Sequence, residues 1–233
     1  MDTEYNAFNE SSKRPFEKGR TPYDGLRPWS AITHGIGIIL AIIGSILLLI
    51  KNIPTHSVVS NISFVVFCAT MIMLYTASTM YHCVNGSVEK RIALRKFDHI
   101  AVNFLIAGTY TPLCLNTLAG PVGYTLLGII WPLALAASGI ALFWINTPRK
   151  LTAAIYIILG WIAVAALPFL WQILGLKPLI WLVGGGILYT IGAILYAKKW
   201  PGRDNPKFGF HEIFHVFILL GTIAHFIFVY LYV

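Results

Sequence analysis

Charged side chains and cysteines are scarce in this sequence. Only 11% of its 233 residues are Asp, Glu, Lys or Arg, whereas soluble domains average about 25%. The three cysteines, Cys68, Cys83 and Cys114, follow no framework spacing, so a disulfide-stapled fold is not indicated. With 57% hydrophobic residues and a mean hydropathy of +0.73, the composition excludes an ordinary soluble protein and indicates a membrane protein.

Loops long enough to fold alone are also missing. Instead, apolar runs recur, and each is long enough to cross a hydrocarbon core of about 30 Å as a helix. The runs cover residues 31–50, 57–81, 97–118, 121–147, 151–176, 178–197 and 208–233. The sequence therefore predicts an all-α fold, a single seven-helix transmembrane bundle over residues 30–233. Residues 1–29 form a polar leader without a small-residue cleavage site, which we expect to be retained, disordered and cytoplasmic.

Basic residues are placed unevenly along the chain. Of the 17 Lys and Arg residues, all but Lys51 and Lys177 fall in the leader or in loops on one side of the predicted bundle. By the positive-inside rule, the N-terminus is cytoplasmic and the C-terminus, after seven crossings, is outside. We therefore interpret the net charge of +8 as a topology signal of a multi-pass protein of the plasma (inner) membrane. The predicted partners are membrane lipids, with anionic inner-leaflet lipids as counter-charge, and not nucleic acid.

Acidic residues are almost absent from the predicted spans, which contain only Asp98 and Glu212. An ionisable group in hydrocarbon costs about 2.5–3.5 kcal/mol and therefore usually has a partner or a function. The predicted topology places most of these groups at one depth, because helices one, three and seven begin and helix two ends on the cytoplasmic side. Besides His225 in the last span, five histidines lie in or at the edges of the spans: His34, His82, His99, His211 and His215.

The stretch HEIFH, residues 211–215, has the spelling of a zinc-protease helix. His211 and His215 are four residues apart, so their rings lie on one helical face at a spacing that zinc can bridge. His225 is about 15 Å further along a continuous helix and too distant for the same ion. The best third ligand by depth is His82, with Cys83 as a weaker candidate. The sequence thus predicts a Zn²⁺ site formed by His82, His211 and His215.

Several polar groups near this site have more than one interpretation. Asp98 is a candidate metal ligand or a base that orients and deprotonates a water molecule. Ser78, one turn before His82, can bond to a substrate, to a neighbouring helix or to its own helix. Glu212 has the position of a protease base, but a helix N-terminus also favours a negative charge there. A lone intramembrane histidine is as often a hydrogen-bonding group as a ligand, so the roles of His34 and His225 stay open. His99 follows Asp98 by one residue and points elsewhere on the helix, which favours a structural role.

Five segments together resemble the hemolysin III family, the bacterial relatives of the adiponectin and progestin receptors (the PAQR group) and, more distantly, of the alkaline ceramidases. They are AITHGIG, STMYH, LRKFDHIAVNFLIAGTYTP, GGGILYTIGAILY and FGFHEIFHVFILLGTIAH. The resemblance spans residues 25–233. It implies a seven-helix bundle with zinc bound by His82, His211 and His215, with Asp98 near the metal and Ser78 matching the serine of the SxxxH motif. One departure concerns Arg27 and Ser30, where family members commonly have an acid and an asparagine.

Three functions are compatible with these observations. The first is a zinc-dependent hydrolase of a lipid amide or ester bond, as in the ceramidase relatives, with Asp98 as the base. The second is a pore-forming cytolysin or channel, although no predicted helix carries a continuous polar stripe. The third is a sensor of membrane state in which zinc has a structural role. The sequence alone names neither the substrate nor the oligomeric state.

Overall fold

The computed structural model describes residues 26–52, 54, 57–144, 146–203, 205 and 207–233, and every regular element in these ranges is helical. The α-helices are α2 (Pro28–Asn52), α3 (Val58–Cys83), α4 (Val88–Pro112), α5 (Pro121–Phe143), α6 (Arg149–Trp161), α7 (Leu167–Leu174), α8 (Leu176–Lys198) and α9 (Phe210–Tyr232). A π-helix, Leu113–Thr117, continues α4, and a 3-10 segment, Ile162–Ala166, joins α6 to α7. The predicted all-α class is confirmed for this part of the chain.

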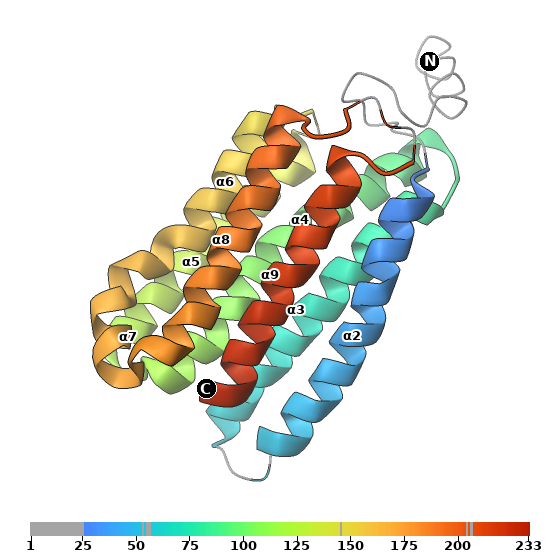
Figure 1. Ribbon diagram of the computed structural model, residues 1–233. Helices are drawn as coiled ribbons and strands as arrows, with labels where there is room; N and C mark the ends of the chain where they lie inside the picture. Colours follow the sequence, from blue (N-terminus) through green and yellow to red (C-terminus); the bar gives the residue numbers. More distant parts are fainter. Residues whose placement is uncertain (1–25, 53, 55–56, 145, 204, 206) are drawn as a thin grey trace.

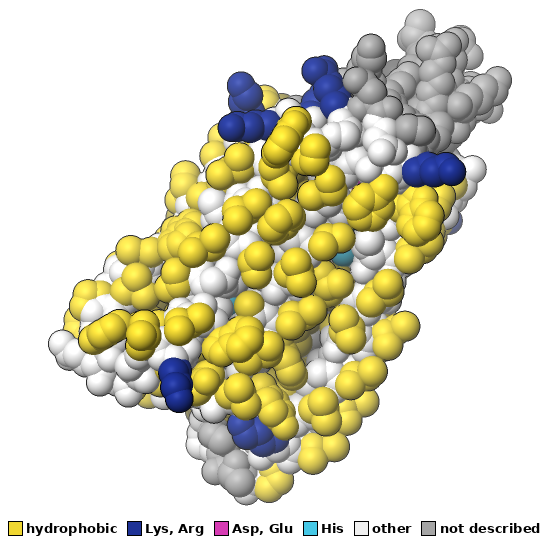
Figure 2. Space-filling model, viewed as in Figure 1, with side chains coloured by type: hydrophobic (Ala, Val, Ile, Leu, Met, Phe, Trp, Pro, Cys, Tyr) yellow, Lys and Arg dark blue, Asp and Glu magenta, His cyan; other side chains and the backbone are white. Residues whose placement is uncertain are grey.

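Six helical stretches are long and apolar enough to cross a membrane: α2, α3, α5, α8, α9 and the continuous stretch Arg149–Leu174. Their outward faces are apolar, as shown on α2 by the exposed side chains of Ile39, Ile43 and Ile50. On the face shown in Figure 2, hydrophobic side chains cover the middle of the molecule and Lys and Arg gather at its two ends. A belt of this kind is solvated by lipid, so the chain is a multi-pass membrane protein.

The helices pack as a closed bundle (Figure 1). α3 packs between α2 and α4, α4 also contacts α5, and α8 packs between α6 and α9. α9 contacts α2 as well, so the first and last described helices lie side by side. We call the end of the bundle where α2, α4 and α9 begin and α3 ends the basic end. This arrangement brings residues from four helices together at one depth.

The helix that contains the predicted third span, residues 97–118, begins earlier than that span. α4 starts at Val88, where the Ser87 hydroxyl oxygen accepts a hydrogen bond from the Lys90 amide at 3.4 Å. Hydropathy missed this part because residues 88–98 carry most of the charge of the helix, which also keeps α4 out of the six apolar stretches. The other predicted span boundaries agree with the structure to within four residues. α2 begins at Pro28, within the predicted leader, and residues 1–25 lie outside the described residues.

The stretch Arg149–Leu174 is not one regular α-helix. It tightens to a 3-10 helix over Ile162–Ala166, directly before Pro168, whose missing amide hydrogen disrupts the regular pattern. Tyr110 of α4 bonds to the backbone at this break. Its hydroxyl accepts from the Ala163 amide at 2.9 Å and donates to the Gly160 carbonyl at 2.7 Å. Such side-chain bonds are what allows irregular backbone at membrane depth.

Candidate metal centre

Three histidines meet inside the basic end of the bundle. His82 lies in the last turn of α3, and His211 and His215 lie in the first two turns of α9. One ligand atom from each lies within 4.8 Å of the other two. His82 and His215 are each 2% exposed, and His211 is half-buried. The structure thus brings together the three residues that the sequence singled out as ligands.

The geometry of this cluster fits a small tetrahedral ion. Metal–nitrogen bonds of about 2.0–2.1 Å at the tetrahedral angle place two ligand nitrogens about 3.3 Å apart. The Nε2 atoms of His82 and His211 are 3.2 Å apart. The ring of His215 lies 5.0 Å from that of His82 and 4.8 Å from that of His211, centroid to centroid. The three histidines could therefore hold a metal ion, and imidazole nitrogens suit Zn²⁺ among other transition metals.

The backbone of α2 fixes the orientation of His215. Its Nδ1 lies 3.2 Å from the Ser30 carbonyl oxygen and 3.4 Å from the Thr33 hydroxyl. Since a carbonyl only accepts, Nδ1 carries the hydrogen, and Nε2 keeps its lone pair for a metal. Sequence reasoning missed this contact. The signal for it was the position of Ser30 and Thr33 at the opening of the first span, at the same depth as the histidines.

His34 contacts the histidine cluster but is not one of its three candidate ligands. Its ring stacks on that of His215, with centroids 3.7 Å apart and an interplanar angle of 12°. The edge of Tyr75 meets it on another side, at 5.1 Å. Both ring nitrogens are buried without a hydrogen-bond partner, and His34 is not in the group whose ligand atoms converge. In this structure His34 therefore supports the ring of a candidate ligand.

A cavity of about 580 Å³, part of it open to the outside, lies against His211 and His215. Asp98 and Ser78 both line it. Asp98 is half-buried and is not in the converging ligand group, which favours its interpretation as a base over that as a ligand. Ser78 is 1% exposed; its hydroxyl has no partner at hydrogen-bond distance, but it lies near enough to the Asp98 carboxyl to interact with it. Cys83, the weaker candidate for the third ligand, is exposed and lies outside the group.

Glu212 is held in a bonding network of its own. It is 2% exposed and accepts hydrogen bonds from the Ser30 hydroxyl at 2.7 Å and from the Gly209 amide at 2.9 Å. The Arg27 guanidinium forms an ion pair with it at 3.5 Å. Two of these partners are the positions at which the sequence departs from the family pattern. Glu212 therefore caps α9 and ties it to α2, and it does not line the cavity.

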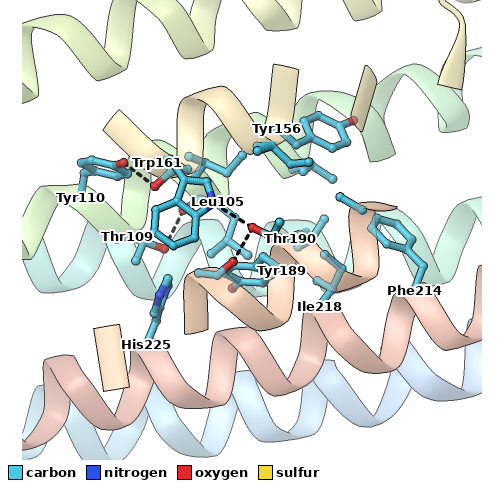
Figure 3. A pocket seen from close by; sticks show the side chains of 17 residues that line it. Leu105, Thr109, Tyr110, Tyr156, Trp161, Tyr189, Thr190, Phe214, Ile218 and His225 are labelled. Atoms are coloured by element: carbon cyan, nitrogen blue, oxygen red, sulfur yellow. Dashed lines mark hydrogen bonds between the residues drawn. The ribbon is translucent and has the colours of Figure 1, made fainter. Parts of the chain in front are cut away.

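A second, apolar cavity adjoins the first, with an empty volume of about 680 Å³ that includes space open to the outside. The two share five lining residues, Leu74, Val102, Tyr156, Phe214 and Ile218. Figure 3 shows Phe214 and Ile218 at one end of this second cavity and His225 at the other. Polar groups on its wall are mostly paired: the Trp161 indole donates to the Thr190 hydroxyl at 2.8 Å, and His225 Nε2 lies 2.9 Å from the Leu182 carbonyl. His225 is thus remote from the histidine cluster, as its sequence spacing predicted.

His99, next to Asp98, also lines the first cavity. Its Nδ1 lies 3.3 Å from the Tyr156 hydroxyl, a contact between α4 and α6. This is the helix-to-helix bond that an isolated membrane histidine commonly makes.

Comparison with known proteins agrees with the resemblance. The haemolysin-III related family model matches residues 28–226. The chain belongs to the hemolysin III family. Hemolysin-3 of Bacillus cereus is 39% identical over 206 residues, 88% of this chain and 90% of that protein. A hemolysin-3 homolog of Bacillus subtilis is 38% identical over 198 residues, 84% of this chain and 89% of its own length.

The sequence match to the wider receptor group covers a shorter part of the chain. The ADIPOR-like receptor IZH2 of Saccharomyces cerevisiae is 36% identical over 52 residues, 20% of this chain and 16% of the yeast protein. It supports the predicted relation to the PAQR group. Family membership and the six apolar stretches together establish a multi-pass protein of the plasma membrane.

Proposed function

We propose that this hemolysin III-family protein is a zinc-dependent hydrolase that cleaves an amide or ester bond of a membrane lipid. The observation that carries the proposal is the convergence of three histidine ligand atoms beside a cavity that Asp98 and Ser78 also line. A purely structural zinc site is normally closed by four protein ligands. Here three donors converge within the described residues, and the space next to them is lined by a carboxylate and a hydroxyl.

His82, His211 and His215 would hold the ion. Zinc in such a site supplies a Lewis acid with a free coordination position. The Asp98 carboxylate takes a proton from the water that attacks the carbonyl carbon. It then delivers that proton to the departing nitrogen or oxygen as the C–N or C–O bond breaks, which leaves a carboxylic acid and an amine or alcohol. Ser78 is a positioning residue, whose free hydroxyl donates a hydrogen bond to the substrate.

The two adjoining cavities support a lipid as the substrate. The apolar cavity against Val102 and Ile218 suits an acyl chain, and the polar cavity with Asp98 suits the bond to be cleaved. An acyl chain that fills the first cavity would exclude bulk water from the second. Exclusion of water strengthens the electrostatic interactions at the reacting atoms.

We infer further that α4 is a seventh crossing. Residues 97–117 contain Asp98 as their only fully charged side chain, and 21 residues of helix cover about 31 Å. α4 packs against α3 and α5, which are both apolar enough to span. Seven crossings with the basic end in the cytoplasm put the histidines within reach of inner-leaflet headgroups.

The test uses the full chain, purified in an uncharged detergent, with His82→Ala, Asp98→Ala and His225→Ala variants. Zinc is measured by elemental mass spectrometry, and lipid breakdown products by mass spectrometry of the incubated membrane extract. Wild type and His225→Ala are expected to carry one zinc per chain, and His82→Ala to lose it. Asp98→Ala is expected to keep its zinc and lose turnover by about 10²-fold or more.

Two results would overturn the proposal: wild-type protein without stoichiometric zinc, or an Asp98→Ala variant that turns over like wild type. The relatives' name, hemolysin-3, points to membrane damage. Release of a trapped dye from liposomes that persists in His82→Ala would favour a pore over the hydrolase.

A further inference from the structure

The basic end contains several arginines that lie partly or wholly inside the bundle, and most of them have evident partners. Arg27 pairs with Glu212. Arg91 donates to the carbonyl oxygens of Tyr81 and Val84, which end α3. These two side chains therefore have structural explanations.

Arg149 is also accounted for, because its guanidinium lies over two aromatic rings. It is 5.5 Å from the ring centre of Tyr196 and 5.4 Å from that of Phe210. Contacts of this kind stabilise a guanidinium through the negative face of the ring.

Arg95 has no such partner. It is 2% exposed, and its buried Nη1 makes no hydrogen bond. Within the described part of the chain, the only ion pair joins Arg27 to Glu212, so no acid lies within 4 Å of Arg95. Asp98, three residues further along α4, lies on the same helical face and interacts with Arg95 electrostatically, but it is too far away to form an ion pair or a hydrogen bond with it. Arg95 lines the same cavity as Asp98, His211 and His215.

A buried guanidinium without a close ion-pair partner is costly. Arginine stays protonated in proteins, and removing an ion from water costs several kcal/mol unless a counter-charge replaces the lost hydration. The planar guanidinium matches the paired oxygens of a carboxylate or phosphate. Arg95 lines a cavity proposed to hold a lipid, so a ligand there is a natural source of a close anion for it.

The position of Arg95 along α4 indicates how a bound ligand would be oriented in the cavity. Asp98 lies about 4.5 Å further into the bundle than Arg95, and Val102, Leu105 and Ile106 follow on the wall of the apolar cavity. A bound lipid would meet these residues in sequence: anionic group, scissile bond, acyl chain. The anion therefore belongs to the amine or alcohol part of the lipid, on the far side of the bond from the acyl chain.

We propose that Arg95 is the anion subsite of this cavity and selects single-chain lipids whose headgroup carries a phosphate or carboxylate next to the acyl linkage. This substrate class rests on the proposed hydrolase function, whereas the binding of the anionic lipid by Arg95 does not. Arg95 touches the ligand and determines specificity, while Asp98 remains available as the base because the ligand supplies the partner of Arg95.

The experiment measures the binding of dodecyl phosphate and of uncharged dodecanol to the full chain in maltoside detergent, by isothermal titration. The proteins are wild type, Arg95→Gln, Arg95→Lys and the control Lys96→Gln, which removes a neighbouring cation that does not line either cavity. Wild type and Lys96→Gln are expected to prefer dodecyl phosphate by about tenfold to hundredfold, the effect of a charge-assisted hydrogen bond. Arg95→Gln is expected to lose this preference, and Arg95→Lys to keep part of it.

Additional measurements distinguish the possible anions. They also test the role of Arg95 independently of the hydrolase activity. Competition by millimolar inorganic phosphate would show a site for free phosphate and overturn the lipid assignment. Dodecanoyl-glycine in place of dodecyl phosphate shows whether a carboxylate serves equally. In a His82→Ala background the preference should persist, so that it stands even if no lipid is hydrolysed. An Arg95→Gln protein that retains the wild-type preference would overturn the subsite, whatever the hydrolase assay shows.

Discussion

The Nε2 atoms of His82 and His211 lie 3.2 Å apart, although the two residues are 129 positions apart in the chain. Two neutral imidazoles can approach in this way only if one donates a hydrogen to the other or if both face a common cation. His215 directs its Nδ1 hydrogen to the Ser30 carbonyl, so its Nε2 keeps a lone pair that is available to the same cation. The arrangement is that of a site preorganised for a metal.

Removal of the metal should therefore destabilise the folded protein. A ligand that binds only the folded state at 1,000 times its Kd stabilises that state by about 4 kcal/mol. We expect a chelator to lower the Tm of wild-type protein in detergent by several degrees, and added zinc to restore it. The Tm of His82→Ala should not respond to either addition.

His225→Ala is the control for this measurement, because His225 is also buried in α9 but lies outside the converging group. Its Tm should respond to chelator as wild type does. A His82→Ala protein whose Tm still falls on chelation would place the metal elsewhere in the molecule.

The shared depth of the histidines could be predicted, because it depends only on the direction in which each span runs. The placement of Lys and Arg gives the orientation of each span, and orientation gives the end at which His82 and His211 lie. The early start of α4 could not be read from hydropathy, since Ser87 and the charged first turns lie outside the apolar run. Helix formation there depends on capping and on buried partners such as those of Arg91.

Contacts that depend on how each helix is rotated about its axis could not be predicted from the sequence. The ion pair of Arg27 with Glu212 and the bond of His215 to Ser30 require a particular face of α9 to meet α2, which packing decides. The position of Arg95 beside the site, by contrast, could have been predicted from the sequence. It lies three residues before Asp98, and residues at this spacing share one face of a helix.

Loss of either partner of the Arg27–Glu212 pair should destabilise the bundle. The side chains are 9% and 3% exposed, so Arg27→Ala would leave a buried carboxylate without its counter-charge, at a cost of about 3 kcal/mol. Glu212→Gln should cost a similar amount, and the double variant less than the sum. The free energy of unfolding in mixed micelles measures this coupling.

Glu89→Gln provides the matched control, because Glu89 also lies in the first turn of a helix but is exposed. Its effect on the free energy of unfolding should be much smaller, because solvent screens an exposed charge. Additive losses at Arg27 and Glu212 would mean that the pair contributes no coupling to stability. Zinc content should be unchanged in all of these variants, since neither residue offers a ligand atom to the cluster.

Two adjacent glycines of α8 should differ sharply in their tolerance of alanine. A Cβ at Gly185 would lie 2.3 Å from Cδ2 of His225 and 3.2 Å from the Gly221 carbonyl, whereas nothing lies within 4 Å of a Cβ at Gly184. Gly185→Ala must displace the His225 ring and break its bond to the Leu182 carbonyl, at a cost of about 1–3 kcal/mol. Gly184→Ala should be neutral or slightly stabilising. Equal Tm values for the two variants would show that α8 and α9 are not packed this closely.

The number of crossings can be tested with reporters fused to the full chain. If α4 spans together with the six apolar stretches and α2 begins in the cytoplasm, the C-terminus lies outside and the loop between α8 and α9 lies in the cytoplasm. Alkaline phosphatase, which is active only outside the cytoplasm, should then be active when fused after Val233 and inactive when inserted at Arg203. Green fluorescent protein should give the opposite pattern, because it fluoresces only when it folds in the cytoplasm. An active phosphatase at Arg203 and an inactive one after Val233 would invert the topology and place the histidines near the outer leaflet.

The same reporter placed between α3 and α4, at Asn85, and between α4 and α5, at Ala119, should differ in activity only if α4 itself crosses.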